Sequence, residues 1–223
     1  GGMTPFSQAV LVHLAKLARQ RGRVMEALGY LREGYNKNPD DFITRYELAY
    51  TLLFVNAFSA SLSHFSEALK LGGTPYLIAD YADKLRESCG NDKAAAYLEP
   101  LIAEHRQSRM LIYELAMTWL RAGNHENAIS WFKKSLALAG EGREQFDLLT
   151  WYNLACAYAL SGKSASAIDA LRKAVEKGWN DAAHMQEDQD LDSLRSLPAF
   201  KLLLEQLLQK REEGRETEKP KGA

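Results

Sequence analysis

The sequence is poor in cysteine, in proline and in long apolar runs. Two cysteines cannot form a disulfide-dense scaffold, and no apolar run approaches the roughly 18 residues that a membrane-spanning helix needs. The 28 lysines and arginines do not outnumber the 29 aspartates and glutamates, so the chain lacks the basic excess typical of proteins that bind phosphate backbones. Few stretches alternate apolar with polar residues as half-buried strands do. These absences predict an all-α protein without a membrane span and argue against a nucleic-acid partner.

What the 223 residues do contain is a repeat of about 34 positions. A large apolar residue followed by alanine recurs at offsets of 34, 33, 34 and 39 residues, at Leu14-Ala15, Leu48-Ala49, Tyr81-Ala82, Leu115-Ala116 and Leu154-Ala155. Twelve positions after each alanine comes a small residue, at Ala27, Ser61, Ala94, Ala128 and Ala167. Four positions further comes a large apolar residue, at Leu31, Phe65, Leu98, Phe132 and Leu171. Five units in register predict five helix pairs, with the small residues where two helix backbones approach closely.

Turn and capping residues agree with this division into helices. Thr74 before Pro75 is an N-cap candidate followed by a proline at the first helical position, and Asp41 offers a cap to the helix that begins the second unit. Gly123 and Gly162 are typical of turns inside units. Each unit is therefore expected to contain two helices of about 12–14 residues joined by a short polar turn.

The fifth unit carries the residues that identify a family. It reads Trp151-Tyr152-Asn153-Leu154-Ala155, followed by Tyr158, Ser161-Gly162, Ala167, Leu171 and Ala174. This pattern resembles the tetratricopeptide repeat and points to a bacterial member of that family. The resemblance implies an all-α, right-handed superhelix of about five helix pairs over residues 4–180, with units at 8–41, 42–74, 75–108, 109–147 and 148–180.

Two features depart from the repeat. The 39-residue step exceeds 34 by five residues, which predicts a longer loop around Ala139 to Arg143. Pro100 falls inside the second helix of the third unit, where it removes one backbone hydrogen bond and is expected to bend the helix.

The two chain ends do not follow the repeat. Gly1 and Gly2 precede Met3 and look like the remnant of a cleaved tag, and no signal peptide follows. Residues 181–210 resemble the segment that follows the last repeat in bacterial members of the family, with a capping helix from Pro198 to about Lys210. Residues 211–223 contain no large apolar residue and are expected to be a disordered charged tail.

Helical periodicity selects the residues of a binding groove, since the resemblance implies that the first helix of each unit lines a concave surface. The candidates are Tyr46, Tyr50, Asp80, Asp83, Tyr113, Met117, Tyr152, Asn153 and Cys156. Such an aromatic and acidic groove favours a protein or peptide partner with apolar and basic side chains. The positions that hold a peptide carboxylate in some family members carry acidic or uncharged residues in this chain, with only Lys16 basic, so we expect no carboxylate clamp. The alternative is that several of the tyrosines pack between neighbouring helices and contact no ligand.

No catalytic, metal-binding or cofactor-binding arrangement is predicted. The five histidines fall in different units without metal-ligand spacing: His13, His64, His105, His125 and His184. Cys89 and Cys156 lie two units apart and are expected to be free thiols, which favours a reducing, cytoplasmic location.

The sequence thus predicts a non-enzymatic interaction module or adaptor that holds a peptide or partner helix in its groove. The first alternative is a structural assembly subunit that scaffolds a larger complex or forms a homo-oligomer, for which Leu207 and Leu208 of the capping helix are candidate contacts. The second alternative is a regulatory fragment of a larger enzyme.

Overall fold

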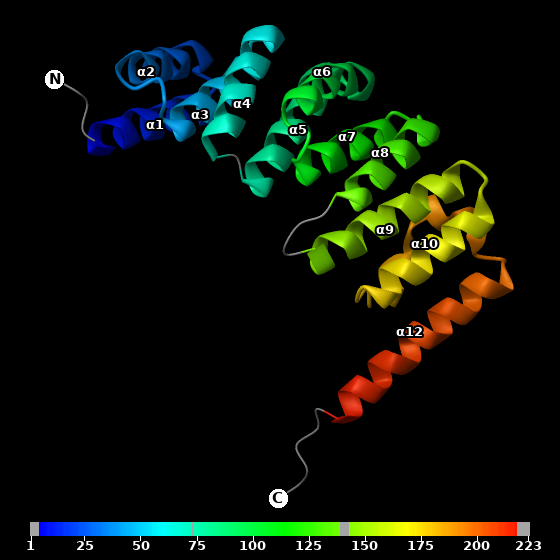
Figure 1. Cartoon of the computed structure of the whole chain (residues 1–223). Helices are drawn as coiled ribbons and strands as arrows, with labels where there is room; N and C mark the ends of the chain where they lie inside the picture. Colours follow the sequence, from blue (N-terminus) through cyan, green and yellow to red (C-terminus); the bar gives the residue numbers. More distant parts are fainter. Residues whose placement is uncertain (1–4, 73, 139–142, 218–223) are drawn as a thin grey trace, which may run out of the picture. The chain divides into compact units, whose positions relative to one another are not determined.

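The computed structural model describes residues 5–72, 74–138 and 143–217 (Figure 1). These residues form helices and short connections and include no strand, so the prediction of an all-α protein is confirmed. They divide into two compact units, Gly1–Glu114 and Leu115–Ala223. The right-handed superhelical path of the whole chain stays a prediction.

Unit 1 is built from stacked helix pairs (Figure 1). Its helices are α1 (Pro5–Gln20), α2 (Val24–Lys37), α3 (Phe42–Leu53), α4 (Phe58–Gly72), α5 (Pro75–Cys89), α6 (Asn91–Glu104) and the start of α7 (Arg109–Arg121). Within each pair the first helix packs on the second, as α1 does on α2, α3 on α4 and α5 on α6. The first helices α1, α3 and α5 also contact one another in sequence, and α4 contacts α6. Unit 1 therefore has a first-helix layer (α1, α3, α5) and a second-helix layer (α2, α4, α6).

The residues that mark the repeat form the core. All five alanines of the large–Ala pairs are buried, and so are the small and large positions that follow them in the second helices. Alanine or serine at these positions lets two helix backbones approach, while leucine or phenylalanine fills the space beside them. Leu14 is the exception among the large residues, because α1 has neighbours only in α2 and α3 among the described helices of unit 1 and leaves Leu14 exposed.

Capping and turn residues act largely as expected. The Asp41 carboxylate accepts a 2.8 Å hydrogen bond from the Thr44 backbone amide and so caps α3. Gly123 and Gly162 have φ of 74° and 76°, a left-handed conformation that glycine adopts without strain. Thr74 is the N-cap of α5 and Pro75 begins the helix, as expected, but the Thr74 side chain makes no capping hydrogen bond.

Unit 2 contains the end of α7, then α8 (His125–Ala137), α9 (Arg143–Leu160), α10 (Ser164–Glu176), α11 (Ala182–Glu187), the 3-10 helix η1 (Gln189–Leu194) and α12 (Pro198–Thr217). The first helix α9 packs on α8, on α10 and on η1, while α12 packs on α10 and α11. The segment after α10 therefore sets η1 beside a first helix and α12 beside a second helix (Figure 1). It stands where another helix pair would stack, which confirms the predicted capping helix.

The structure differs from the expectations at the start of the fifth unit and near the C-terminal end of the chain. The five extra residues before the fifth unit lengthen α9, which begins eleven residues before Leu154, whereas α7 begins six residues before Leu115. The predicted boundary at 147/148 therefore falls inside α9, and of the predicted loop Arg143 is helical while residues 139–142 lie outside the described residues. The tail expected to be disordered from residue 211 is helical as far as Thr217, because lysine, arginine and glutamate are good helix formers. α6 continues past Pro100 to Glu104, and the expected bend at Pro100 stays a prediction.

Candidate functional site

The nine predicted groove residues divide between the two units. Five lie in unit 1, on α3, α5 and α7: Tyr46, Tyr50, Asp80, Asp83 and Tyr113. Four lie in unit 2, on α7 and α9: Met117, Tyr152, Asn153 and Cys156.

Tyr46 joins two first helices of unit 1 and does not present its ring to solvent. The side chain is buried, and its hydroxyl donates a 2.5 Å hydrogen bond to Asp80 Oδ2. Burial, reinforced by the Asp80 carboxylate, raises the pKa of Tyr46 far above that of free tyrosine. The expectation of a partner contact is therefore wrong for Tyr46, because its hydroxyl and ring are used to hold α3 against α5.

An ion pair between the partly buried Arg19 and the buried Glu47 connects α1 to α3. Arg19 Nη1 donates to Glu47 Oε2 at 2.8 Å and to the Thr51 hydroxyl at 2.7 Å. Lys16 Nζ reaches the other Glu47 oxygen at 2.8 Å. Sequence reasoning did not place Arg19 or Glu47 in the candidate surface.

The same arrangement recurs 67 residues later, between α5 and α7. Arg86 Nη1 lies 3.0 Å from Glu114 Oε2, and both side chains are buried. Each arginine comes four residues after a repeat alanine, and each glutamate stands directly before the large residue of a repeat pair. This shared register is the signal that could have revealed both pairs.

Tyr50 and Phe54 form the exposed aromatic patch of the first-helix layer. Their ring centroids are 5.7 Å apart, and Phe54 is exposed while Tyr50 is half-buried. The Arg19 guanidinium carbon lies 4.6 Å from the Tyr50 centroid, and Lys84 Nζ lies 4.1 Å from the Phe54 centroid. Cations over ring faces fix the orientation of the rings. We call Tyr50 and Phe54, with these two cations, the aromatic patch.

The charges on α5 beside the aromatic patch differ in their access to solvent. The Asp83 and Glu87 side chains are 55% and 68% exposed, whereas those of their partners Arg86 and Lys84 are 6% and 20% exposed. The carboxylates therefore face water while the cations lie beneath them. Asp83 and Glu87 thus place two exposed carboxylates on this part of the surface, paired with Arg86 and Lys84 respectively.

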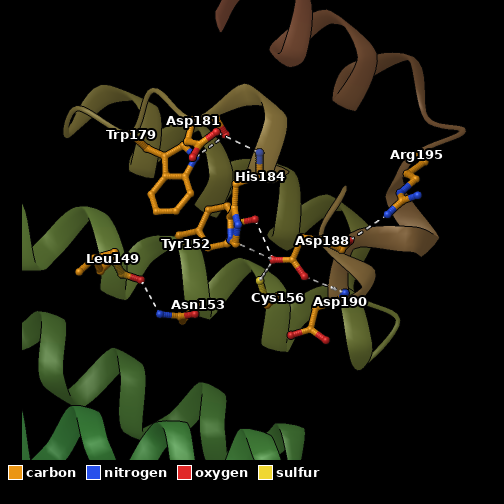
Figure 2. Close-up of polar contacts among 10 residues, drawn as sticks. All are labelled: Leu149, Tyr152, Asn153, Cys156, Trp179, Asp181, His184, Asp188, Asp190 and Arg195. Carbon is orange, nitrogen blue, oxygen red and sulfur yellow. Dashed lines mark hydrogen bonds and ion pairs between the residues drawn. The ribbon is translucent and has the colours of Figure 1, made fainter. Parts of the chain in front are cut away.

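The remaining predicted residues on α7 and α9 are half-buried. These are Tyr113, Met117 and Asn153. The Asn153 side-chain amide donates a 3.0 Å hydrogen bond to the Leu149 carbonyl of its own helix (Figure 2).

In unit 2 the chain covers its own first helix (Figure 2). Tyr152 and Cys156 are buried beneath the segment between α10 and α12. The Tyr152 hydroxyl donates a 2.8 Å hydrogen bond to Asp188 Oδ2, and Cys156 Sγ lies 3.7 Å from the same oxygen. The expectation that these two side chains contact a partner is therefore wrong, because residues after the last repeat take that place.

Aromatic stacking holds the covering segment in position. The rings of Trp179 and Tyr152 stack with centroids 3.9 Å apart and an angle of 14° between their planes. His184 lies against both rings, and the Asp188 backbone carbonyl accepts a hydrogen bond from Arg195 (Figure 2). Residues 179–195, which we call the covering segment, thus form a folded part of unit 2.

One group of side chains has the ligand types of a metal site. Cys156, Asp188 and Asp190 bring a sulfur and two carboxylate oxygens within 4.8 Å of one another. Burial and the neighbouring carboxylates raise the pKa of the Cys156 thiol well above its usual range, so the sulfur is protonated at neutral pH. Asp188 accepts hydrogen bonds from Tyr152 and from the Asp190 amide. These contacts account for the cluster as an internal hydrogen-bond network.

Comparison with known proteins agrees with the stacked helix pairs. Residues 107–177 match a family model described as tetratricopeptide repeat. The tetratricopeptide repeat is thus supported over this part of the chain. This family is generally a non-enzymatic protein-interaction fold, which supports an interaction or scaffold role. A second model, described as the N-terminal domain of A/B hydrolase-like proteins, matches residues 145–216, from α9 into α12.

Solved tetratricopeptide-repeat structures resemble the chain at low identity. MamA 41-end from Desulfovibrio magneticus RS-1 is 18% identical, with a TM-score of 0.47 over 77% of this chain and 94% of that one. YrrB, described as a TPR protein with an unusual peptide-binding site, is 16% identical, with a TM-score of 0.45 over 75% and 84%. The APC/C hetero-tetramer Cut9-Hcn1 gives 18% identity and a TM-score of 0.47 over 90% of this chain and 42% of that one.

A membrane span requires a helix that is both long and apolar. None of the helices in residues 5–72, 74–138 and 143–217 is long enough and apolar enough to cross a bilayer. The cytoplasmic location and the bacterial origin stay predictions.

Proposed function

We propose that the first-helix layer of unit 1 binds a peptide or partner helix at the aromatic patch. The observation that carries this proposal is that Phe54 is exposed on a surface whose other groups are fixed by internal contacts. Tyr50 and Phe54 are held by Arg19 and Lys84, so little side-chain entropy would be lost when a partner packs on them. Aromatic anchors of this kind dominate the energy of protein interfaces.

The expected partner carries apolar and basic side chains. Apolar groups would pack on the rings of the aromatic patch, while lysine or arginine would meet the exposed carboxylates of Asp83 and Glu87. The cations of this surface lie lower and are already paired, so they add little attraction for an acidic partner. The binding surface is narrower than the sequence suggested, because Tyr46, Tyr152 and Cys156 are buried.

The test is selection of peptides from a displayed random library on the whole chain. The enriched peptides should combine aromatic or aliphatic residues with lysine or arginine. Tyr50→Ala and Asp83→Asn should each weaken a selected peptide about ten-fold or more. Circular dichroism would verify that both variants remain folded.

Two matched variants separate this site from general surface effects. Tyr76 is an exposed tyrosine at the start of α5, and Asp169 forms with Arg172 the same i,i+3 pair that Asp83 forms with Arg86. Tyr76→Ala and Asp169→Asn should leave affinity unchanged. Enrichment of acidic peptides, or equal losses in the control variants, would overturn the proposal.

A role in assembly is a second candidate, favoured by Leu202 and Leu208, which are exposed on α12. Leu207, the other residue expected at such a contact, is buried within unit 2. Leu207→Ala should therefore destabilise the chain itself, whereas Leu208→Ala should break a dimer without loss of stability. Sedimentation of the two variants against the unaltered chain tests this, and a concentration-independent monomer contradicts it.

A regulatory part of a larger enzyme is a third candidate, favoured by the match of residues 145–216 to the A/B hydrolase-like N-terminal domain. An antibody against this chain should then detect a polypeptide much larger than 25.0 kDa in cells of the source organism. A band at the mass of the chain would contradict this candidate.

A further inference from the structure

The second-helix layer of unit 1 contains a cavity that the proposed function does not use. It has a volume of about 360 Å³ and lies between α4 and α6. Its apolar wall includes Leu62, Tyr97 and Leu101. Glu67, from α4, and Glu104, from α6, supply carboxylates to the same cavity. One wall is thus suited to a hydrocarbon chain and the other to a cation.

The carboxylates are held in place by neighbouring side chains. Ser66 donates a 2.6 Å hydrogen bond to Glu104 Oε2, and Lys70 donates a 2.7 Å hydrogen bond to Glu67 Oε1. These hydrogen bonds lower the pKa of each carboxyl, so both are ionised at neutral pH. Lys70 Nζ lies 3.6 Å from Glu104 as well. Two carboxylates therefore face one ammonium group.

The imidazole of His105, beside the cavity, adds no balancing charge. His105 lies 3.0 Å from the Ser66 hydroxyl. Burial lowers the pKa of its imidazole, which keeps the ring neutral at neutral pH. Among the residues that line the cavity, the two carboxylates therefore carry one charge more than Lys70 balances, while Arg45, outside the lining, also lowers the pKa of Glu67.

We propose that this cavity binds an arginine side chain of a partner protein. The methylene groups of the arginine would lie along Leu62 and Leu101 and its guanidinium against the Tyr97 ring. Its five donors would meet Glu67 and Glu104 in the planar geometry that suits carboxylates. Lysine fits less well, because its single ammonium would compete with Lys70 at the same point. This contact lies on the second-helix layer and is separate from the aromatic patch.

The probe is the blocked tripeptide acetyl-Gly-Arg-Gly-amide, titrated into the ¹⁵N-labelled whole chain and followed by amide chemical shifts. Saturable shifts should centre on Leu62, Ser66 and Leu101. The citrulline tripeptide, which keeps the shape but lacks the charge, should bind about ten-fold more weakly, and so should the lysine tripeptide. Equal binding of either one would overturn the proposal, as would the lack of localised shifts.

Substitutions at the cavity test whether the amide chemical shifts report binding of the tripeptide there. Glu104→Gln should weaken the arginine tripeptide about ten-fold, and Ser63→Trp, at an exposed lining position, should fill the cavity and abolish binding. Glu126→Gln, at an exposed carboxylate paired with Lys163 on unit 2, is the matched control and should change nothing. Unchanged affinity in folded Glu104→Gln or Ser63→Trp overturns the proposal. Tyr50→Ala and Asp83→Asn should leave these shifts in place, so the aromatic patch and the cavity can fail independently.

Discussion

The hydrogen bond from Tyr152 to Asp188 repeats, in unit 2, the hydrogen bond from Tyr46 to Asp80 in unit 1. Both tyrosines stand two residues before the large residue of a repeat pair. Asp80 belongs to the first helix of the next repeat, whereas Asp188 belongs to the covering segment. The chain therefore ends its stack by supplying the same acceptor from a segment that is not a repeat.

Loss of the Tyr152 or the Tyr46 hydroxyl should reduce the stability of the folded chain. Tyr152→Phe and Tyr46→Phe keep the ring but remove a donor from a carboxylate that is shielded from water. Each variant should lower the free energy of unfolding by about 1.5–3 kcal/mol, the range for hydrogen bonds to charged groups. Urea denaturation measures this. Tyr76→Phe, at an exposed tyrosine, is the control and should show no change.

The Arg19–Glu47 pair should contribute far more to the free energy of unfolding than an exposed ion pair with a similar N···O distance. The Glu47 side chain is 6% exposed, whereas that of Glu126, which pairs with Lys163, is 68% exposed. Glu47→Ala should destabilise unit 1 by about 3–5 kcal/mol, because the shielded Arg19 loses its counter-charge. Glu126→Ala should cost less than about 1 kcal/mol. Similar losses in both variants would show that burial does not decide the strength of these pairs.

The two cysteines should differ in their reaction with iodoacetamide. Cys156 is buried against Asp188 and its thiol is protonated, whereas Cys89 is only half-buried near the end of α5. Alkylation needs an accessible thiolate, so Cys89 should be modified first and Cys156 only when the chain is unfolded. Peptide mass spectrometry at timed intervals, with and without urea, measures the difference. Equal rates in the folded chain would mean that the covering segment opens readily.

Asp190 should make the free energy of unfolding depend on pH, because its ionised form destabilises the folded state. Burial, and then the nearby Asp188 carboxylate, raises the pKa of Asp190 in the folded state. Its ionised form is therefore less favourable in the folded state than in the unfolded chain, and this cost is present in full above the raised pKa. As the pH falls through the folded-state pKa toward the unfolded value near 3.9, the cost disappears because both states become protonated.

Asp190→Asn should accordingly raise the melting temperature by a few degrees at pH 7, with the gain shrinking as the pH falls toward 4. Calorimetric melting curves across this range measure the effect. Asp192→Asn, at an exposed carboxylate paired with Arg195 in the same 3-10 helix, is the control and should gain nothing at neutral pH. A gain in Asp190→Asn that stays constant with pH would show that the ionised carboxylate is not what limits stability.

The repeat spacing was sufficient to predict the helix pairs and the core. Ala15, Ala49 and Ala82 are buried because only a small side chain fits where the helices of neighbouring pairs meet. Asp41 could also be assigned as a cap, because capping depends on residues three positions apart. Such features follow from local spacing, and spacing is directly readable in a sequence.

The candidate site was predicted less well, because it depends on contacts between repeats. Helical periodicity put Tyr46 and Tyr50 on the same face, yet the Tyr46 hydroxyl reaches Asp80 and is buried while Tyr50 lies beside the exposed Phe54. A shared face does not reveal which side chain a neighbouring helix will cover. Arg19 was missed for the same reason, since its partner lies 28 residues away.

The sequence by itself determined the helical class, the register of the repeat and the need for a cap after the last pair, because each of these follows from the periodic spacing of apolar and small residues. Only the tertiary structure decided that the extra residues lengthen α9, that the covering segment closes over Tyr152 and Cys156, and that Phe54 is the exposed ring of the aromatic patch. These outcomes depend on which distant side chains meet and exclude water, and burial of that kind is a property of the packed chain.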